Sequence, residues 1–335
     1  MDRFQDLIRH ALNDDQPTVL AQVVQVQGSA YRKEGTSMLI SRDGSKMGMI
    51  SGGCLESDVM IRAEELFQTG KAEIYEYDLS SEDDLGWGAG AGCNGVISVF
   101  VRDIDSRFRE QLASINAILR QKRPVLFFQS LDCHDHYGYV AEMQPADFSG
   151  TPEFTEIYRD LLNNGLPFTA MSKIYHFKEE RLFIQIIWPK QELYLAGAGE
   201  DSRFLASLAN QLGFSVHILD WRSAFCSRDF FPFAKSLQIG EIDQIIRQLH
   251  LDIFDSLIIM THDFQRDRKI LKAVKDAQLN YVGILGSRKR TERLLDGDIP
   301  QWLHSPIGLS IGADGPEEIA VSIMAEIISK RGKRL

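Results

Sequence analysis

The chain from residue 190 to residue 335 alternates short apolar runs with segments of helical spacing, and this alternation constrains the fold most strongly. Leu193–Ala196 is the first apolar run, and the next segment keeps its apolar residues on one helical face until Gly213. Later apolar runs are Ser215–Leu219, Leu257–Met260 and Tyr281–Leu285. Because strands that are joined through helices pair in parallel, the sequence predicts a Rossmann-like, doubly wound parallel-sheet domain over residues 190–335.

Residues 1–189 lack this regular alternation and are predicted to form a separate α+β domain. The total of 335 residues suits two domains of about 100–200 residues each. A break at Pro189-Lys190-Gln191 separates them. Helices are expected at Phe4–Ala11, Glu56–Phe67 and Asp105–Leu119, and strands at Val19–Val26, Ser37–Ile40, Ile97–Val101, Val125–Phe128 and Leu182–Trp188. The order of these strands in a sheet does not follow from the sequence.

The composition argues against several classes of protein. The formal net charge of −10 disfavours general binding to nucleic acid, which requires a basic face. Apolar runs stay well short of the about 20 residues of a membrane helix, and the first residues lack the layout of a signal peptide. The four cysteines (Cys54, Cys93, Cys133 and Cys226) form no CxxC pair, which predicts reduced thiols and a cytoplasmic location.

Two glycine-rich segments in the first domain each carry a cysteine. In Ser51-Gly52-Gly53-Cys54, paired glycines allow either a tight turn with a buried thiol or close approach of a ligand to the backbone. The stretch 86–95 has five glycines beside Cys93, which is costly to order unless its backbone is needed. If Cys54 and Cys93 converged, their thiolates would suit a soft metal centre such as molybdenum, or a sulfur atom. The sequence does not show whether they converge.

Other segments suit binding of anions or metals. The loop from Gly28 to Gly35 follows a strand and places two cations beside a glycine and a serine. The cluster Cys133-His134-Asp135-His136 lies between two predicted strands, so a hairpin turn is favoured over a metal site.

The second domain offers candidate residues at the carboxyl ends of its predicted strands, where such sheets bind ligands. Gly197 and Gly199 would let a phosphate approach a helix start, and Asp220 would bind ribose hydroxyls. The run Gly286-Ser287-Arg288 combines a helix start with positive charge and predicts an anion site. His262 suits either a proton carrier or phosphate contact, or an ordinary surface position. The alternative is a Rossmann-like domain that binds no nucleotide.

Taken together and in this order, the motifs resemble the XdhC/CoxI family of xanthine dehydrogenase accessory proteins. The resemblance spans nearly the whole chain. The matching stretches are Gly28-Ser29-x-x-Arg32-x-x-Gly35, Ser51–Glu56, Gly92–Gly95, Gly197–Gly199, Thr261–Asp263 with Asp267, Tyr281–Arg288 and Pro306–Ile323.

The resemblance implies a chaperone without turnover of its own that binds the molybdenum cofactor, keeps its sulfurated form intact and assists its insertion into xanthine dehydrogenase-type molybdenum hydroxylases. It places the protein in purine catabolism, with such an enzyme as client, a cysteine desulfurase as a further partner, and a homodimer as its expected state. Cys54 or Cys93 would lie beside the molybdenum or its sulfur, and the Gly286 segment or the Gly197 turn would hold the cofactor's phosphate. The expected site is a cleft between the domains.

Two other functions remain open from the sequence. An NAD(P)-dependent oxidoreductase would use the turn from Gly197 to Ser202 together with Asp220 to bind a nucleotide or dinucleotide. A maturation scaffold that binds no small molecule would use the same fold without a ligand.

Overall fold

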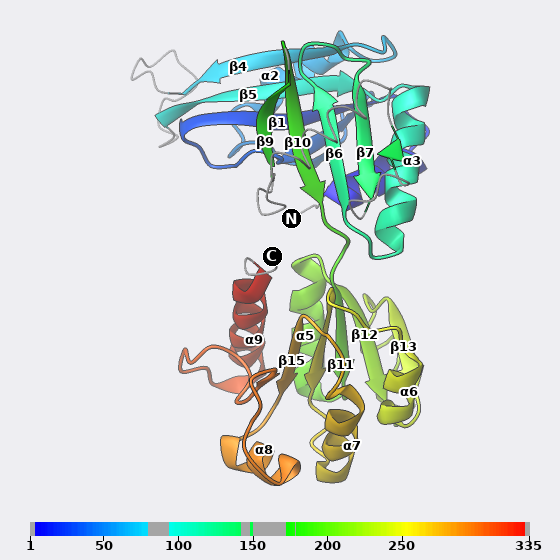
Figure 1. The fold of residues 1–335 in the computed structure, drawn as a ribbon, viewed down its shortest axis with the longest axis vertical. Helices are drawn as coiled ribbons and strands as arrows, with labels where there is room; N and C mark the ends of the chain where they lie inside the picture. Colours follow the sequence, from blue (N-terminus) through cyan, green and yellow to red (C-terminus); the bar gives the residue numbers. More distant parts are fainter. Residues whose placement is uncertain (1–3, 80–93, 142–147, 150–171, 178, 332–335) are drawn as a thin grey trace. The chain divides into compact units, whose positions relative to one another are not determined.

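The computed structural model describes residues 4–79, 94–141, 148–149, 172–177 and 179–331. The chain divides into two compact units, Asp2–Pro189 and Lys190–Leu335, drawn in Figure 1. Each unit has its own hydrophobic clusters, so the two are described in turn.

The second unit is built on a six-stranded sheet in which all neighbouring strands pair in parallel. The strand order is β13-β12-β11-β14-β15-β16, which is a doubly wound order and confirms the fold class predicted from the sequence. The strands are β11 (Glu192–Ala196), β12 (Ser215–Asp220), β13 (Ser236–Ile239), β14 (Asp255–Ile259), β15 (Tyr281–Ile284) and β16 (Leu303–His304). The helices are α5 (Glu200–Gln211), α6 (Ile242–Gln248), α7 (Phe264–Val274), α8 (Arg288–Leu295) and α9 (Gly315–Arg331).

Helices cover both faces of this sheet because alternate side chains of a strand point to opposite faces. Leu193 and Leu195 of β11 pack in one cluster with apolar residues of α5 and α9. Tyr194 and Ala196 pack in the other with residues of α6, α7 and α8. Gly213 adopts a φ of +82° just after α5, as expected for a residue that ends a helix.

The first unit contains two five-stranded sheets whose strand pairs are all antiparallel. The first sheet has the order β3-β2-β1-β5-β4 and the second β8-β7-β6-β10-β9. Its strands are β1 (Thr18–Ser29), β2 (Ser37–Ser41), β3 (Lys46–Gly48), β4 (Ala72–Asp78), β5 (Asn94–Asp103), β6 (Val125–Ser130), β7 (Tyr137–Ala141), β8 (Phe148–Ser149), β9 (Ser172–Phe177) and β10 (Glu180–Ile187). Its described helices are α1 (Phe4–Asn13), α2 (Glu56–Glu64) and α3 (Ser106–Arg120). The predicted α+β class is confirmed.

Glutamine side chains join the two sheets of the first unit across its interior. Gln22 of β1 donates to the Gln185 amide oxygen of β10 at 2.8 Å, and Gln129 of β6 donates to Gln22 at 2.8 Å. These amides are buried, so each bond replaces one that water would otherwise make. The segment Cys133–His136 is the turn between β6 and β7, and His136 N–H donates to the Cys133 carbonyl at 3.0 Å, as the hairpin prediction required.

Candidate functional site

Residues 49–55, here called the thiol loop, connect β3 to α2 and are fixed from inside by Glu56. The Glu56 side chain is buried, and its Oε1 accepts the backbone N–H groups of Ile50 at 3.2 Å and Ser51 at 2.8 Å. The Ser51 hydroxyl donates to Oε2 of the same carboxylate. Ser51 Oγ in turn accepts the N–H groups of Gly53 at 3.1 Å and Leu55 at 3.2 Å. The loop therefore has one backbone course that these contacts define.

Burial and hydrogen bonding act in opposite directions on the Glu56 carboxyl group. Burial raises its pKa, but the hydrogen bonds from Ser51 and from the backbone outweigh burial, and the pKa lies below its usual value. Glu56 is consequently a carboxylate at neutral pH, which is the form that accepts the loop's N–H groups.

Cys54 follows two exposed glycines in this loop. Its thiol is half-buried and lies 3.7 Å from Ser51 Oγ. Gly53 has a φ of +114°, and a Cβ atom built on it would meet no heavy atom within 4 Å. Of the two interpretations drawn from the sequence, the structure combines parts of both: Cys54 packs against the cluster of buried residues under the loop, yet the space over Gly53 is open.

Residues 30–36, here called the aromatic loop, lie against the thiol loop. They connect β1 to β2. A Cβ atom on Gly52 would lie 4.0 Å from Cγ of Tyr31, and an Arg32 guanidinium nitrogen lies 3.9 Å from the Met49 sulfur. Ala30 and Cys54 pack against the same hydrophobic cluster. The Gly28–Gly35 segment and the Ser51–Cys54 segment, separate in the sequence, thus share one surface.

The second predicted thiol, Cys93, lies outside the described residues, as does most of the glycine-rich stretch around it. The first described residue after it, Asn94, pairs with Ser29 at the end of β1 that leads into the aromatic loop. Convergence of Cys54 and Cys93 stays a prediction. Cys226 is buried and Cys133 lies in the β6–β7 turn.

In the second unit, the two predicted phosphate-turn glycines have different surroundings. A Cβ on Gly197 would come within 2.4 Å of the Met260 carbonyl oxygen, and Gly197 has a φ of +121°. Close packing of β11 against the end of β14 therefore requires Gly197. A Cβ on Gly199 would meet nothing within 4 Å, so the start of α5 is open. Two acids, Glu200 and Asp201, occupy the first turn of α5 and oppose a phosphate there.

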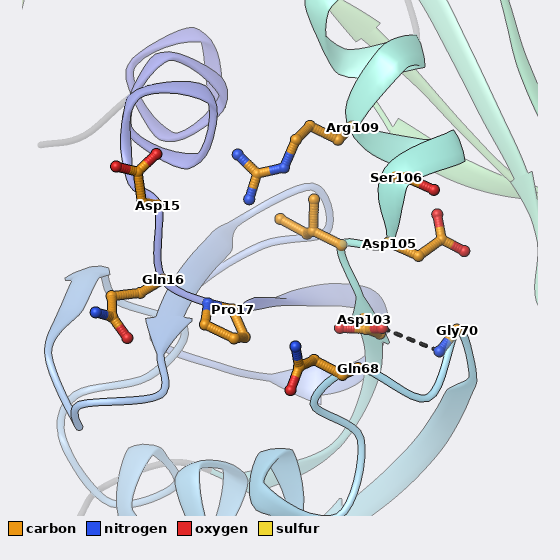
Figure 2. A pocket seen from close by; sticks show the side chains of 10 residues that line it. Asp15, Gln16, Pro17, Gln68, Gly70, Asp103, Asp105, Ser106 and Arg109 are labelled. Carbon is orange, nitrogen blue, oxygen red and sulfur yellow. Dashed lines mark hydrogen bonds between the residues drawn. The ribbon is translucent and has the colours of Figure 1, made fainter.

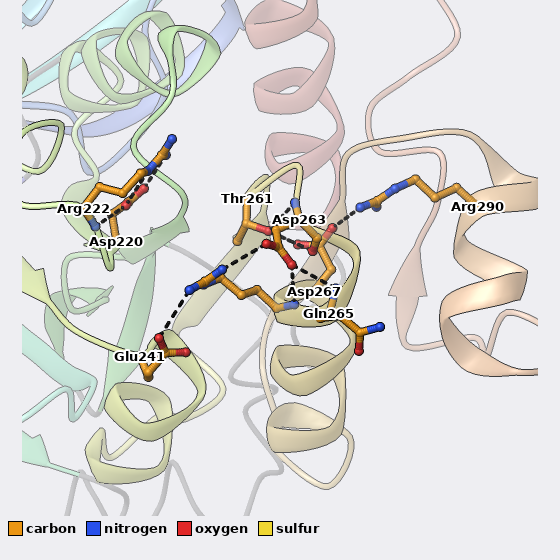
Figure 3. A network of polar contacts seen from close by, with 9 residues as sticks. Asp220, Arg222, Glu241, Thr261, Asp263, Gln265, Asp267 and Arg290 are labelled. Atoms are coloured by element: carbon orange, nitrogen blue, oxygen red, sulfur yellow. Dashed lines mark hydrogen bonds and ion pairs between the residues drawn. The ribbon is translucent and has the colours of Figure 1, made fainter.

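Asp220 uses its carboxylate to hold this turn, and Figure 3 shows its contact with Arg222. The side chain has 0% exposure, and it accepts the Ala198 N–H at 2.6 Å. Arg222 donates to both carboxylate oxygens, at 3.0 and 2.8 Å. Burial raises the pKa of Asp220, but the hydrogen bonds from Arg222 and the backbone hold it below its usual value. These contacts make Asp220 a structural link between β12 and the glycine turn, and a role towards a ribose stays a prediction.

The remaining predicted residues lie in the segments that follow the carboxyl ends of β14 and β15. His262 is exposed, has a φ of +58° and lies 3.4 Å from Asp201. Ser287 is the N-cap of α8, directly after Gly286, which has a φ of +131°. Arg288 pairs with Glu292 on the surface at 3.0 Å. The segment thus presents a capped helix start and an exposed guanidinium, as an anion site needs, although binding stays a prediction.

Near the carboxyl ends of these strands, a buried carboxylate of α7 pairs with an arginine of α8 (Figure 3). Asp267 has 1% exposure, accepts the Thr261 hydroxyl at 2.5 Å and pairs with Arg290 at 2.7 Å. The Arg290 guanidinium is therefore partly neutralised by the buried Asp267 carboxylate, and it adds less positive charge to the predicted anion site than its position in the sequence suggests.

A pocket of about 340 Å³ lies at the start of α3 in the first unit (Figure 2). Asp105 caps α3 by accepting the Phe108 N–H at 2.7 Å, and Asp103 accepts the Gly70 N–H at 2.9 Å. The pocket adjoins the start of β1, whereas the aromatic loop follows its end. Sequence reasoning missed it because its walls come from three separate connections: Asp15, Gln16, Pro17, Gln68, Gly70, Asp103, Ile104, Asp105, Ser106 and Arg109.

Two features are absent from the part of the chain that the structure describes. Within these ranges, no cluster of three or more His, Cys, Asp or Glu side chains is arranged to hold a metal ion. Among the helices of the described ranges, none is both long and apolar enough to cross a membrane.

Both units of the chain match one known protein family. Residues 193–327 match the XdhC Rossmann domain, and residues 11–78 match the XdhC and CoxI family. The chain belongs to the XdhC/CoxI family, as the resemblance noted from its motifs indicated.

Similar proteins extend over nearly the full length. A Bacillus subtilis protein described as a probable subunit of xanthine dehydrogenase is 39% identical over 335 residues, covering 99% of this chain and 98% of its own. A Bacillus halodurans crystal structure described as a xanthine dehydrogenase has a TM-score of 0.87 and 36% identity, covering 100% of this chain and 97% of its own. The molybdenum cofactor insertion chaperone PaoD of Escherichia coli is 25% identical over 329 residues, covering 96% of this chain and 86% of its own.

Proposed function

We propose that this protein binds the molybdenum cofactor and assists its insertion into a xanthine dehydrogenase-type molybdenum hydroxylase. The observation that carries the proposal is the Cys54 thiol, which lies half-buried on a loop fixed by Glu56 with open space over Gly53. The similarity to a molybdenum cofactor insertion chaperone over most of both chains supports it.

The chemistry of the thiol loop suits such a cargo. The cofactor carries molybdenum with soft sulfur ligands, and a thiolate is a soft ligand that matches such a centre. Ser51 accepts the N–H groups on both sides of Cys54, so the loop need not reorganise to present the thiol. We propose that Cys54 contacts the molybdenum or its exchangeable sulfur, and that this contact protects the sulfurated form until transfer. A cysteine desulfurase that supplies the sulfur and a homodimeric state belong to the same proposal.

The second unit favours this role over NAD(P)-dependent oxidation. Glu200 and Asp201 place negative charge at the helix start where a dinucleotide phosphate would lie. The Asp220 carboxylate, which would bind the ribose, already accepts hydrogen bonds from Ala198 and Arg222. When NAD(P)H is mixed with the protein, we expect the fluorescence of the dinucleotide to stay unchanged.

The test is an anaerobic titration of the full-length protein with molybdenum cofactor, in which bound molybdenum and pterin are measured separately. We expect the wild type to bind, and Cys54→Ala to bind at least about tenfold more weakly, about 1.4 kcal/mol. Cys133→Ala is the matched control, because Cys133 is also a half-buried free thiol of the first unit but lies in the β6–β7 turn. A Cys54→Ala, Cys93→Ala double variant with wild-type affinity would remove the thiols from the proposal, and a wild type that fails to bind would end it.

A further inference from the structure

The aromatic loop and the thiol loop present exposed side chains on backbones that are held from inside. The aromatic loop folds back along β1, where Val23 N–H donates to the Thr36 carbonyl at 2.8 Å and Gly35 N–H donates to the Val23 carbonyl at 2.8 Å. The Glu34 carboxylate accepts the Val26 N–H at 3.1 Å. Tyr31, with 65% exposure, nevertheless stands out from this pinned segment.

The buried glutamine network extends to the same loop. Gln185, which accepts a hydrogen bond from Gln22, donates from its Nε2 to the Gly35 carbonyl at 3.3 Å. A Cβ on Gly35 would lie within 2.8 Å of that nitrogen, so the loop has little room to move inward. An exposed aromatic ring on a fixed backbone loses little conformational entropy when a ligand packs on it.

The side chains that meet at the junction of the two loops have complementary chemistry. The Arg32 guanidinium carbon lies 5.1 Å from the centre of the Tyr31 ring, and Met49 exposes 42% of its surface beside it. Gly52 keeps the near side of the ring clear of a further side chain. An aromatic face, a cation and a thioether therefore meet at this junction, and Cys54 belongs to the same thiol loop as Met49.

We propose that Tyr31 is the platform on which the planar pyrimidine ring of the cofactor's pterin stacks, with Arg32 supplying positive charge beside it. The inference rests on the proposed function and assigns the organic part of the cofactor to the aromatic loop, while Cys54 faces the molybdenum end. A planar heterocycle has a π face that stacks on tyrosine irrespective of its substituents, and a neighbouring guanidinium favours carbonyl and anionic groups on that ring. The two roles fall to neighbouring loops because Tyr31 belongs to the aromatic loop and Cys54 to the thiol loop.

The test compares Tyr31→Ala, Tyr31→Phe and Cys54→Ala in two titrations, one with the molybdenum cofactor and one with a phosphorylated pterin that lacks dithiolene and metal. We expect Tyr31→Ala to weaken binding of both ligands about tenfold or more, and Tyr31→Phe to bind both within about twofold of wild type because the ring is kept. Cys54→Ala is expected to weaken binding of the molybdenum cofactor but not binding of the phosphorylated pterin. Phe233→Ala, which removes an aromatic ring of 63% exposure from the second unit, is the matched control.

The outcomes distinguish the two proposals. If wild type binds the cofactor and Tyr31→Ala binds it equally well, the platform is overturned and the proposed function stands. If Tyr31→Ala keeps its affinity for the cofactor but loses transfer to the client enzyme, Tyr31 is a protein contact and the platform is likewise overturned. If wild type binds no cofactor, both proposals fall.

Discussion

Replacement of Glu56 by glutamine tests whether this carboxylate fixes the thiol loop. The side chain keeps its shape, so Oε1 can still accept the N–H groups of Ile50 and Ser51. The amide nitrogen then replaces the oxygen that accepts the Ser51 hydroxyl. Ser51 cannot simply turn around, because its oxygen already accepts from Gly53 and Leu55.

The expected cost follows from these contacts. Two hydrogen bonds lose the contribution of the charge, and one becomes a contact between two donors in a buried place. Hydrogen bonds to a charged group are worth about 1.5–3 kcal/mol and neutral ones about 1 kcal/mol. We therefore expect Glu56→Gln to lower the free energy of unfolding by about 2–4 kcal/mol at pH 7.

The same carboxylate gives the effect a pH dependence with a defined sign. The folded-state pKa of Glu56 lies below its unfolded value of about 4.3. Its stabilising contribution is thus fully present above that pH and is lost as the pH falls through the folded-state pKa. The difference between wild type and Glu56→Gln should be largest near pH 7 and shrink as the pH falls below the unfolded-state pKa of about 4.3.

Urea unfolding at several pH values, combined with hydrogen exchange of the segment 49–56, measures both effects. Glu64→Gln is the matched control, because Glu64 is an exposed glutamate of the same helix, and its effect should stay within about 0.5 kcal/mol. A Glu56→Gln protein as stable as wild type, or one whose deficit is the same at every pH, would refute the reasoning.

Two further predictions concern the second unit, and thermal unfolding checks both. Gly197→Ala should lower stability by about 2 kcal/mol or more, because its Cβ would lie 2.4 Å from the Met260 carbonyl oxygen at a positive φ, whereas Gly199→Ala should cost less than about 1 kcal/mol. Equal midpoints for the two variants would contradict this account. Arg290→Ala should cost about 3 kcal/mol by leaving the Asp267 charge buried without its ion-pair partner, and recovery in an Asp267→Asn, Arg290→Ala double variant is the control.

The fold of the second unit was largely predictable because its determinants are local. Each apolar run is short and most are followed by a glycine or a polar residue, and the intervening helices show their own apolar faces. The edge strands β13 and β16 were missed because they lack such runs: β13 is half-buried and β16 has two residues. The order of strands in the first unit could not be predicted, since β1 pairs with β5, far along the chain, and such pairings leave no local signal.

Some features of the candidate site could likewise be predicted from the sequence, and others could not. The glycine–cysteine segment could be recognised from its residue types, and so could the helix start at Ser287. The contact between the thiol loop and the aromatic loop was not predicted as a single surface, because the two loops are brought together by the pairing of β2 with both β1 and β3. The roles of Glu56 and Asp220 as internal anchors were likewise invisible, since a carboxylate in a sequence carries no sign of whether it will be buried.

The sequence by itself determined the chain's family, its division into an α+β and a Rossmann-like part, and the residue types available for a soft ligand. Glycine positions and apolar periodicity depend on local backbone conformation, so they can be interpreted without a structure. Only the tertiary structure decided which polar groups are consumed inside the protein and which stay exposed. Asp220, Arg290 and Ser51 form hydrogen bonds or ion pairs with neighbouring residues, whereas Tyr31 is exposed and Cys54 is half-buried. That distinction depends on burial and partner distances, which arise only when distant segments pack together.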